Sequence, residues 1–290
     1  KDAMRANTLG SRNVAVGESA LDAMNLTTAT NSYNIGVGYF AGGSITTGVQ
    51  NTLIGGLAGD AITTGDNNVA LGYEALTANT VGDRSTALGN FALKSQNPAT
   101  NTDMYNVGIG HNAGGDITTG VENVLIGGLA GDAITDADYN VAVGGQAMGD
   151  NTVGSKSVAV GYTALTSQNP ATATDMFNTA VGFQAGSNVT TGFNNTLIGG
   201  KAGDAITSGD NNVAVGINAL TADTLGDRNV AIGAAALATQ NFTTSTDVYN
   251  VGVGYLAGYS ITTGIENTLL GGQAGDALTD ADANVAVGKG

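Results

Sequence analysis

The apolar and polar positions of this chain recur in short tiles, each beginning at an Asn or, in two tiles, at a Ser. With that residue numbered zero, position one is β-branched and position three is Val, Ile or Leu, which is the alternation of a β-strand. The tiles begin at Asn13, Asn34, Asn51, Asn68, Ser85, Asn106, Asn123, Asn140, Ser157, Asn178, Asn195, Asn212, Asn229, Asn250, Asn267 and Asn284. One long tile is followed by three shorter tiles of equal length, and the order then starts again, so the complete repeat consists of four tiles.

Two further positions are constant within the tile. Position four is Gly in all sixteen tiles, and position seven is Ala in the fifteen tiles that reach it. A Gly after every strand indicates a sharp turn or a positive φ, and a fixed Ala indicates a place without room for a larger side chain. In the first repeat these structural positions are Gly17, Gly38, Gly55, Gly72, Ala20, Ala41, Ala58 and Ala75, with Asn51 and Asn68 as examples of the recurring Asn.

Self-similarity at a short fixed period predicts the fold directly, because stacked repeats bury a core that no single repeat can form. We expect an all-β protein, a parallel β-solenoid of about sixteen 17- or 21-residue coils in four 72-residue units. A single continuous domain is predicted over residues 1–290, with a partial first coil at 1–12. The repeats then cover 13–84, 85–156, 157–228 and 229–290.

Four tiles are longer because they carry a four-residue insertion. The insertions lie in the segments 25–33, 96–105, 168–177 and 240–249, which are rich in Asn, Thr and Asp. This composition is typical of loops, and one insertion in every complete repeat places them on one side of the solenoid.

Position two suggests a contact with another chain. If positions one and three face the interior, position two faces outward, on a surface of Ala and Gly interrupted by four Leu. These are Leu53, Leu125, Leu197 and Leu269. Such a stripe suits close approach of a second chain, and a parallel homotrimer is its simplest form. The alternative is that some coils invert which side is interior.

Composition limits the function classes. The chain contains 46 Gly, 2 Pro and no Cys or Trp, and its net charge is −15. Nucleic acid and anionic membrane surfaces reward clusters of Lys and Arg that this chain lacks, so neither is an expected partner. No apolar run approaches the roughly 18 residues of a membrane-spanning helix, so we expect no membrane insertion.

The repeats resemble two known families. The segments NVALGYEAL at 68–76, SVAVGYTAL at 157–165 and NVAIGAAAL at 229–237 resemble the repeats of phage tail-fibre proteins, and they are similar to the head repeats of trimeric autotransporter adhesins. The resemblance covers residues 13–288. It implies a left-handed β-roll in a side-by-side or intertwined trimer that serves as a shaft or receptor-binding head. Autotransporter heads generally have shorter coils than the tiles of this chain.

Two motifs suggest metal or ice binding. GGLAGDAIT at 55–63 and its three copies approach a calcium-binding nonapeptide, with Asp60, Asp132, Asp204 and Asp276 as candidate ligands. Calcium rolls need that motif in tandem, whereas these copies occur only once in each complete repeat, so turn-forming Asp is the favoured explanation. Thr pairs such as Thr46 and Thr47 skip coils, which disfavours an ice-binding lattice.

Aromatic residues recur in two places. One group follows the position-four Gly, as at Tyr39 and Tyr73, and the other ends each insertion. The second group consists of Tyr33, Tyr105, Phe177 and Tyr249. Exposed rings suit a glycan receptor, although an aromatic residue at the foot of a loop more commonly anchors that loop.

Catalytic residues are not indicated, so we expect no enzyme and no cofactor, with calcium kept as an alternative. His111 is the only His, and other tiles carry Tyr, Phe, Gly or Asn at its position. The leading hypothesis is an extracellular, non-enzymatic segment of a phage tail fibre on the virion. It would act as a rigid shaft or would bind a cell-surface glycan or protein receptor. The alternatives are the head of a bacterial surface adhesin, and a calcium- or ice-binding extracellular solenoid.

Overall fold

A computed structural model describes residues 2–290, and all regular elements among them are β-strands. The chain divides into two compact units, residues 1–142 and 143–290. Each unit is a stack of coils, and each coil contributes one three-residue strand to a parallel sheet whose strand order follows the chain. The expected β-solenoid of about sixteen coils is therefore confirmed.

The strands are short and regularly placed. In the first unit the three-residue strands are β2 (Val14–Val16), β4 (Ile35–Val37), β5 (Thr52–Ile54), β6 (Val69–Leu71), β8 (Thr86–Leu88), β10 (Val107–Ile109) and β11 (Val124–Ile126). In the second unit they are β14 (Val158–Val160), β16 (Thr179–Val181), β17 (Thr196–Ile198), β18 (Val213–Val215), β20 (Val230–Ile232), β22 (Val251–Val253), β23 (Thr268–Leu270) and β24 (Val285–Val287). Strand β12 (Val141–Val143) spans the boundary between the units.

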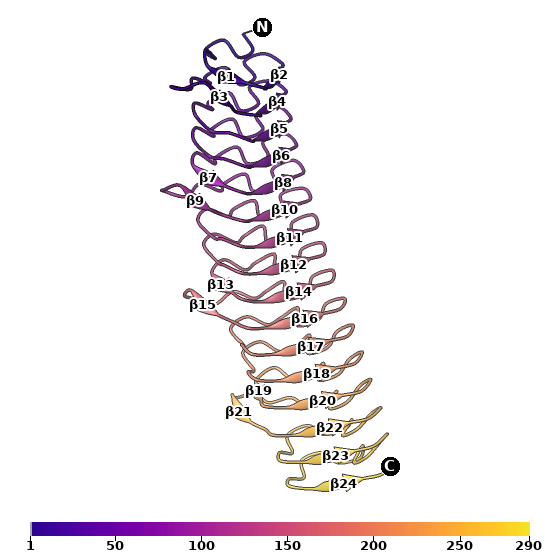
Figure 1. Ribbon diagram of the computed structural model, residues 1–290. Helices are drawn as coiled ribbons and strands as arrows, with labels where there is room; N and C mark the ends of the chain where they lie inside the picture. The colour runs from indigo at the N-terminus through magenta and orange to yellow at the C-terminus, as the bar shows by residue number, and fades with distance from the viewer. Residues whose placement is uncertain (1) are drawn as a thin grey trace. The chain divides into compact units, whose positions relative to one another are not determined.

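Neighbouring coils pair in register without slippage. Leu53 of β5 lies opposite Gly36 of β4 and Ala70 of β6, and Figure 1 shows these three strands one above another. Backbone hydrogen bonds join the coils at both strand ends, as from Ile35 N to the Asn51 carbonyl at 2.8 Å. The register stays the same across the longer coils, because the four extra residues leave the coil as an insertion and the same tile position returns to the same place.

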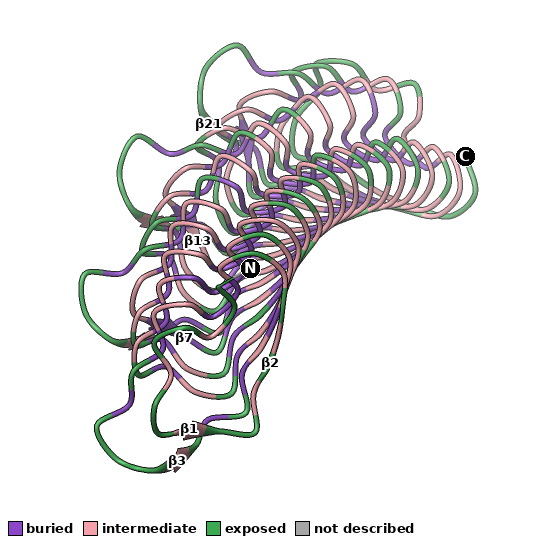
Figure 2. Ribbon diagram, turned by 90° about the horizontal axis from the view of Figure 1, so that it is seen from above, coloured by how far each residue is buried: buried purple, intermediate pink, exposed green. Residues whose placement is uncertain are grey.

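Each insertion adds a second, smaller strand pair. In the first unit β1 (Gly10–Ser11) pairs with β3 (Thr30–Asn31), and β7 (Gly82–Asp83) pairs with β9 (Thr102–Asp103). In the second unit β13 (Gly154–Ser155) pairs with β15 (Thr174–Asp175), and β19 (Gly226–Asp227) pairs with β21 (Thr246–Asp247). Figure 2 shows the loop that leads into β21 as an exposed bulge beside the coils. Each insertion thus projects from its coil, and its last residues pair with a short strand at the end of the preceding coil.

The expected orientation of the strands was wrong. Position two faces the interior, and positions one and three face outward. In each three-residue strand between the first and the last coil, the middle residue is buried and the two residues beside it are not. The four Leu proposed for contact with another chain are all fully buried within this chain. They are Leu53, Leu125, Leu197 and Leu269. The inversion holds for every coil strand, not only for some of them.

The recurring Asn explains the inversion. Asn51 Nδ2 donates to the Gly65 carbonyl at 2.8 Å, and Asn51 Oδ1 accepts from the Asn68 backbone N–H at 2.9 Å. These backbone groups at the coil corner are buried, and a buried polar group without a partner costs free energy, so the Asn side chain must point inward. Side chains alternate along a strand, so position two points inward with the Asn and positions one and three point outward.

The interior is filled by complementary Leu and Gly residues. A Cβ atom added to Gly42 would lie 2.6 Å from Leu53 Cδ1, and one added to Gly59 would lie 2.8 Å from Leu53 Cδ2. Leu53 therefore occupies the space that position eight leaves free in its own coil and in the preceding coil. Leu21 fills the space beside Gly36 in the same way, at 2.8 Å. Because the large and small residues alternate over four coils, close packing repeats with the complete four-tile repeat rather than with the single tile.

The position-four Gly serves a different purpose. Gly17, Gly38, Gly55 and Gly72 have φ between 131° and 143°, a region that L-residues with a side chain rarely adopt. A Cβ at Gly38 would also lie 2.6 Å from the carbonyl carbon of Gly55 in the next coil. Both restrictions act together at the turns formed by these four Gly residues.

Candidate functional site

The outer strand face in each unit carries a band of side chains that is aliphatic at every position three and at position one except where Thr stands there. Position one is Val, Ile or Thr and position three is Val, Ile or Leu, and all of them are half-exposed or exposed. In the first unit Leu71 of β6 and Leu88 of β8 lie opposite each other and are 43% and 40% exposed. Scattered exposed apolar residues are ordinary, but a contiguous apolar band marks an interaction surface.

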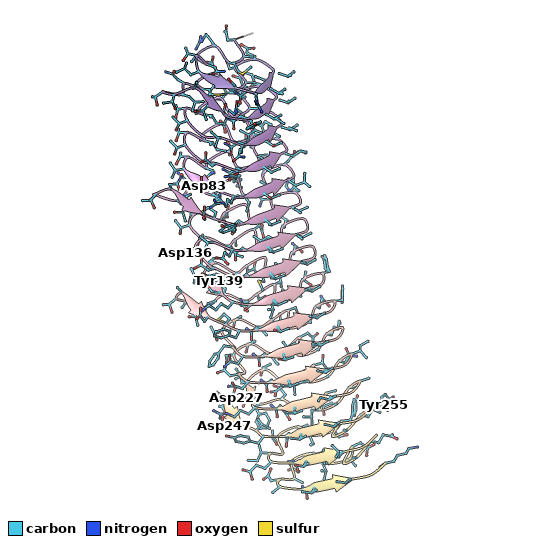
Figure 3. The ribbon with its side chains drawn as sticks, in the orientation of Figure 1. Asp83, Asp136, Tyr139, Asp227, Asp247 and Tyr255 are labelled. Atoms are coloured by element: carbon cyan, nitrogen blue, oxygen red, sulfur yellow. The ribbon has the colours of Figure 1, made fainter. Side chains whose placement is uncertain are left out.

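The aromatic side chains also lie mainly on the surface. All nine Tyr residues are between 41% and 61% exposed. Those after the position-four Gly lie at one end of the strands, and those before position zero lie at the other. Figure 3 shows Tyr255 on the opposite side of the strands from Asp227 and Asp247. Some rings contact each other between coils, such as Tyr73 with Phe91 and Phe91 with His111, at centroid distances of 5.6 and 5.7 Å.

The aromatic residue at the end of each insertion contacts a basic residue of the preceding coil. In the first unit the Arg84 guanidinium lies 5.7 Å from the centre of the Tyr105 ring and forms an ion pair with Asp103. We call this arrangement the insertion-foot cluster. The second unit repeats it twice, with Lys156, Asp175 and Phe177 and with Arg228, Asp247 and Tyr249. In the first insertion Arg12 contacts Tyr33 alone, because Asn31 replaces the Asp.

The geometry of these clusters supports anchoring of the loop foot. Each ring has one face toward a cation, which is attractive even at a surface, and the acidic partner holds the cation in place. The rings remain about half exposed. They therefore hold the insertion to the coil and also present an aromatic surface to solvent.

A turn closed by its own first side chain precedes each longer coil. In the first unit Asn79 closes the four-residue turn 79–82, because its Oδ1 accepts from Gly82 N at 2.9 Å and its Nδ2 donates to the Gly82 carbonyl at 2.8 Å. Asn7 closes the turn 7–10 in the same way. In the second unit Asn151 closes the turn 151–154 with distances of 3.0 and 2.8 Å. We call these segments the capping turns.

The fourth capping turn, 223–226, carries Asp223 in place of Asn. Its Oδ1 accepts from Gly226 N at 3.0 Å, but a carboxylate has no hydrogen to donate to the Gly226 carbonyl. Its Oδ2 instead accepts from Gln240 Nε2 at 2.6 Å and from Asn229 Nδ2 at 3.5 Å. Burial raises the pKa of Asp223 above the ordinary value, and the hydrogen bonds, with that of Gln240 the strongest, act in the opposite direction.

The candidate calcium ligands are not gathered into one site. Thr77 donates a hydrogen bond to Asp60, and Thr221 donates to Asp204, so these carboxylates bind hydroxyls of the next coil. Burial raises the pKa of Asp60, with the Thr77 hydrogen bond opposing it. Across residues 2–290, no group of three or more His, Cys, Asp or Glu is placed to hold a metal ion.

The Thr pairs and His111 make contacts with neighbouring coils. Thr46 Oγ1 donates to the Thr63 carbonyl at 3.1 Å, and Thr118 and Thr190 bind the following coil in the same manner. The exposed His111 ring packs edge-on against Phe91. No pocket occurs within the described part of the chain.

Sequence reasoning missed the buried polar residues near the insertions. Gln96 Oε1 accepts from Ser85 Oγ at 3.1 Å and from Asn106 Nδ2 at 3.0 Å, which carries the Asn ladder across the coil that begins with Ser. The available signal was that Gln recurs at 96, 168 and 240, in three of the four repeats, inside a segment whose composition otherwise predicts a loop. A second signal was the Asp that replaces Asn at 223.

Comparisons with known proteins assign no family to this chain. No protein-family model matches it, and neither a curated protein nor a solved structure does so. Over residues 2–290 we find no helix with the length and apolar character needed to cross a bilayer. The surfaces described above are therefore the basis for a functional proposal.

Proposed function

We propose that this chain is a non-enzymatic structural segment of an extracellular fibre, of the kind found in phage tail fibres, and that it assembles side by side with copies of itself. The observation that carries this proposal is the aliphatic band at positions one and three. The band repeats with every coil, so a partner that covers it must repeat with the same spacing of about 4.8 Å. A second copy of this chain satisfies that requirement, and a parallel homotrimer is the form we expect.

The assembly is tested by sedimentation equilibrium at micromolar concentration. We expect the mass of three chains for the unmodified protein. The double variant Leu71→Glu and Leu88→Glu places two charges on the band without touching the core, and we expect it to sediment as a single chain. The matched control, Ala99→Glu and Thr100→Glu, adds the same charges on an exposed insertion and should leave the trimer intact. A single-chain mass for the unmodified protein would refute the assembly.

The insertion-foot clusters support a second role, recognition of a receptor. Each presents a half-exposed ring beside an ion pair whose groups can hydrogen-bond to hydroxyls, a combination that suits saccharides. The net charge of −15 disfavours anionic glycans, so the expected ligand is a neutral one. Several copies along each fibre would act together through avidity.

Binding to an array of neutral glycans tests this role. We expect Tyr105→Ala and Tyr249→Ala to reduce binding to any glycan that the unmodified protein retains. Tyr139→Ala is the matched control, because Tyr139 is equally exposed but does not end an insertion. Equal effects of Tyr105→Ala and Tyr139→Ala on glycan binding would show that the insertion-foot cluster is not the recognition surface.

A further inference from the structure

The fourth capping turn differs chemically from the three turns that it replicates. Asn7, Asn79 and Asn151 each bind both the N–H and the carbonyl of a Gly three residues later. Asp223 accepts a hydrogen bond from the N–H of Gly226 but does not bind the carbonyl of that residue. The side chain is fully buried, and the Gly226 carbonyl, which keeps its hydrogen bond from Asn212 Nδ2 at 2.9 Å, receives no second bond from the ionised carboxylate.

The surroundings of Asp223 are neutral. Its direct partners are the side-chain amides of Gln240 and Asn229 and the backbone N–H groups of Leu225, Gly226 and Phe242. The charged groups on the neighbouring segments make other contacts. Asp227 accepts from Asp210 N and Ser245 Oγ, and Arg228 is paired with Asp247. An ionised Asp223 is therefore a buried charge without a countercharge.

Two further residues are arranged around this carboxylate. In the first unit Gln96 Nε2 donates to Ser85 Oγ, whereas in the second unit Gln240 Nε2 donates to Asp223. Asn229 stands where Ser85 stands in the first unit. Because Gln240 lies at the start of the fourth insertion, Asp223 connects the coil to the insertion that ends at Tyr249.

We propose that the capping turn 223–226 is a pH-responsive joint in the second unit. When Asp223 is neutral, its hydroxyl takes the place of the Asn Nδ2 and donates to the Gly226 carbonyl, so the turn closes like its three copies. When Asp223 loses its proton to solvent, that donor is lost and a lone charge remains buried. The turn and the insertion segment 240–249 then open more often.

The direction of the effect follows from the shifted equilibrium. Burial raises the pKa of Asp223 in the folded chain, so the folded state holds the proton at a pH where the unfolded state has released it. The stabilisation is complete below the unfolded value of about 4 and is lost as the pH rises through the raised pKa. Within that window local opening should increase by about tenfold per pH unit, because one proton is released on opening.

Hydrogen exchange of the full chain followed by mass spectrometry tests the joint. Exchange is measured from pH 4 to pH 8 and corrected for the intrinsic rate. We expect peptides covering 218–245 to open more as the pH rises, and peptides covering 146–173, which contain the Asn151 turn, to change much less. Asp210 in the same unit also has a pKa raised by burial, so the comparison requires variants.

Two substitutions isolate Asp223. Asp223→Asn should remove the pH dependence of peptides 218–245, whereas Asp280→Asn removes an exposed carboxylate from the same unit outside the insertion-foot cluster and should leave it unchanged. The reciprocal variant Asn151→Asp should create pH dependence in peptides 146–173, and this result does not depend on how well Asp223→Asn folds. Unchanged pH dependence in Asp223→Asn, or none created in Asn151→Asp, would overturn the proposal.

Discussion

Leu53 and Ile54 are neighbours in strand β5, yet Leu53 is fully buried and Ile54 is half exposed. The inner face of the coil strands carries Ala, Gly and Leu, the outer face carries Val, Ile, Leu and Thr, and the two faces have different surroundings. On the inner face, Leu side chains pack against Gly residues. The outer face is not covered by any other described part of its unit. The difference shows that apolar character does not decide which face is interior. The buried Asn at position zero decides it, because its hydrogen bonds fix the direction of alternation.

The largest effect we expect comes from the Gly that ends each strand. Gly110 has a φ of 133°, and a Cβ there would lie 2.6 Å from the carbonyl carbon of Gly127. Gly110→Ala should therefore lower the free energy of unfolding by about 4 kcal/mol, through backbone strain and a clash with the next coil. Gly128→Ala is the matched control, because a Cβ there meets nothing within 4 Å. Urea unfolding followed by circular dichroism measures both, and similar losses would contradict the account.

The two faces of one strand give the next largest difference. Leu53→Ala should lower the free energy of unfolding by about 3 kcal/mol, because it leaves a cavity between Gly42 and Gly59. Ile54→Ala removes an aliphatic side chain of similar size from the outer face. In a single-chain background, such as the Leu71→Glu and Leu88→Glu variant, it should change the free energy by no more than about 0.5 kcal/mol. Equal losses in the urea midpoints would mean that both faces are packed.

The Asn ladder gives a smaller but specific loss. Asn51→Ala removes the bond to the Gly65 carbonyl and the acceptor for Asn68 N, so it leaves two buried backbone groups without these partners. We expect a loss of about 2 kcal/mol. Hydrogen exchange at Asn68 should accelerate more than exchange at Val107, which lies further along the same unit. Uniform acceleration across the unit would show that the Asn acts only through packing.

The smallest effect tests the pairing of Leu with Gly. Gly42→Ala places a Cβ against Leu53, so it should destabilise the unmodified chain. The same change should cost about 1 kcal/mol less once Leu53 is replaced by Ala, because the shortest contact is gone while the contact with Leu21 Cδ2 at 2.9 Å and the strain at positive φ remain. A double-mutant cycle measures this coupling. Additive effects would show that Leu53 and Gly42 are not coupled, and the four-tile period would then not result from the packing of Leu against Gly.

The fold was predictable from the sequence because the signal repeats sixteen times. The Gly at position four recurs in every tile, and the register of the strands follows from the spacing of the tiles in the sequence. The orientation of the strands was not predicted, since Val14 and Val16 are as apolar as any core residue, and only the hydrogen-bonding needs of the Asn separate the faces. The role of Leu53 depends on Gly42 in another coil, and that contact appears only after the coils are stacked.

The candidate surfaces were predictable to a lesser degree. The aromatic residue that ends each insertion was identified, but its basic partner lies one full coil earlier, as Arg84 does from Tyr105, and no local pattern links the two. The buried partners of Asp223 were also hidden, because Gln240 stands in a segment whose composition predicts an exposed loop. Contacts between coils determine both features, whereas a local pattern describes one coil at a time.

The most direct test of self-assembly through the outer strand face is thiol labelling, since the chain contains no Cys. Leu71→Cys places a thiol on that face, and Ala70→Cys places one in the interior of the same strand. We predict that the thiol at 71 is labelled rapidly in dilute protein and slowly at micromolar concentration, while the thiol at 70 is protected at both. Labelling at 71 that is equally fast at every concentration would contradict the account.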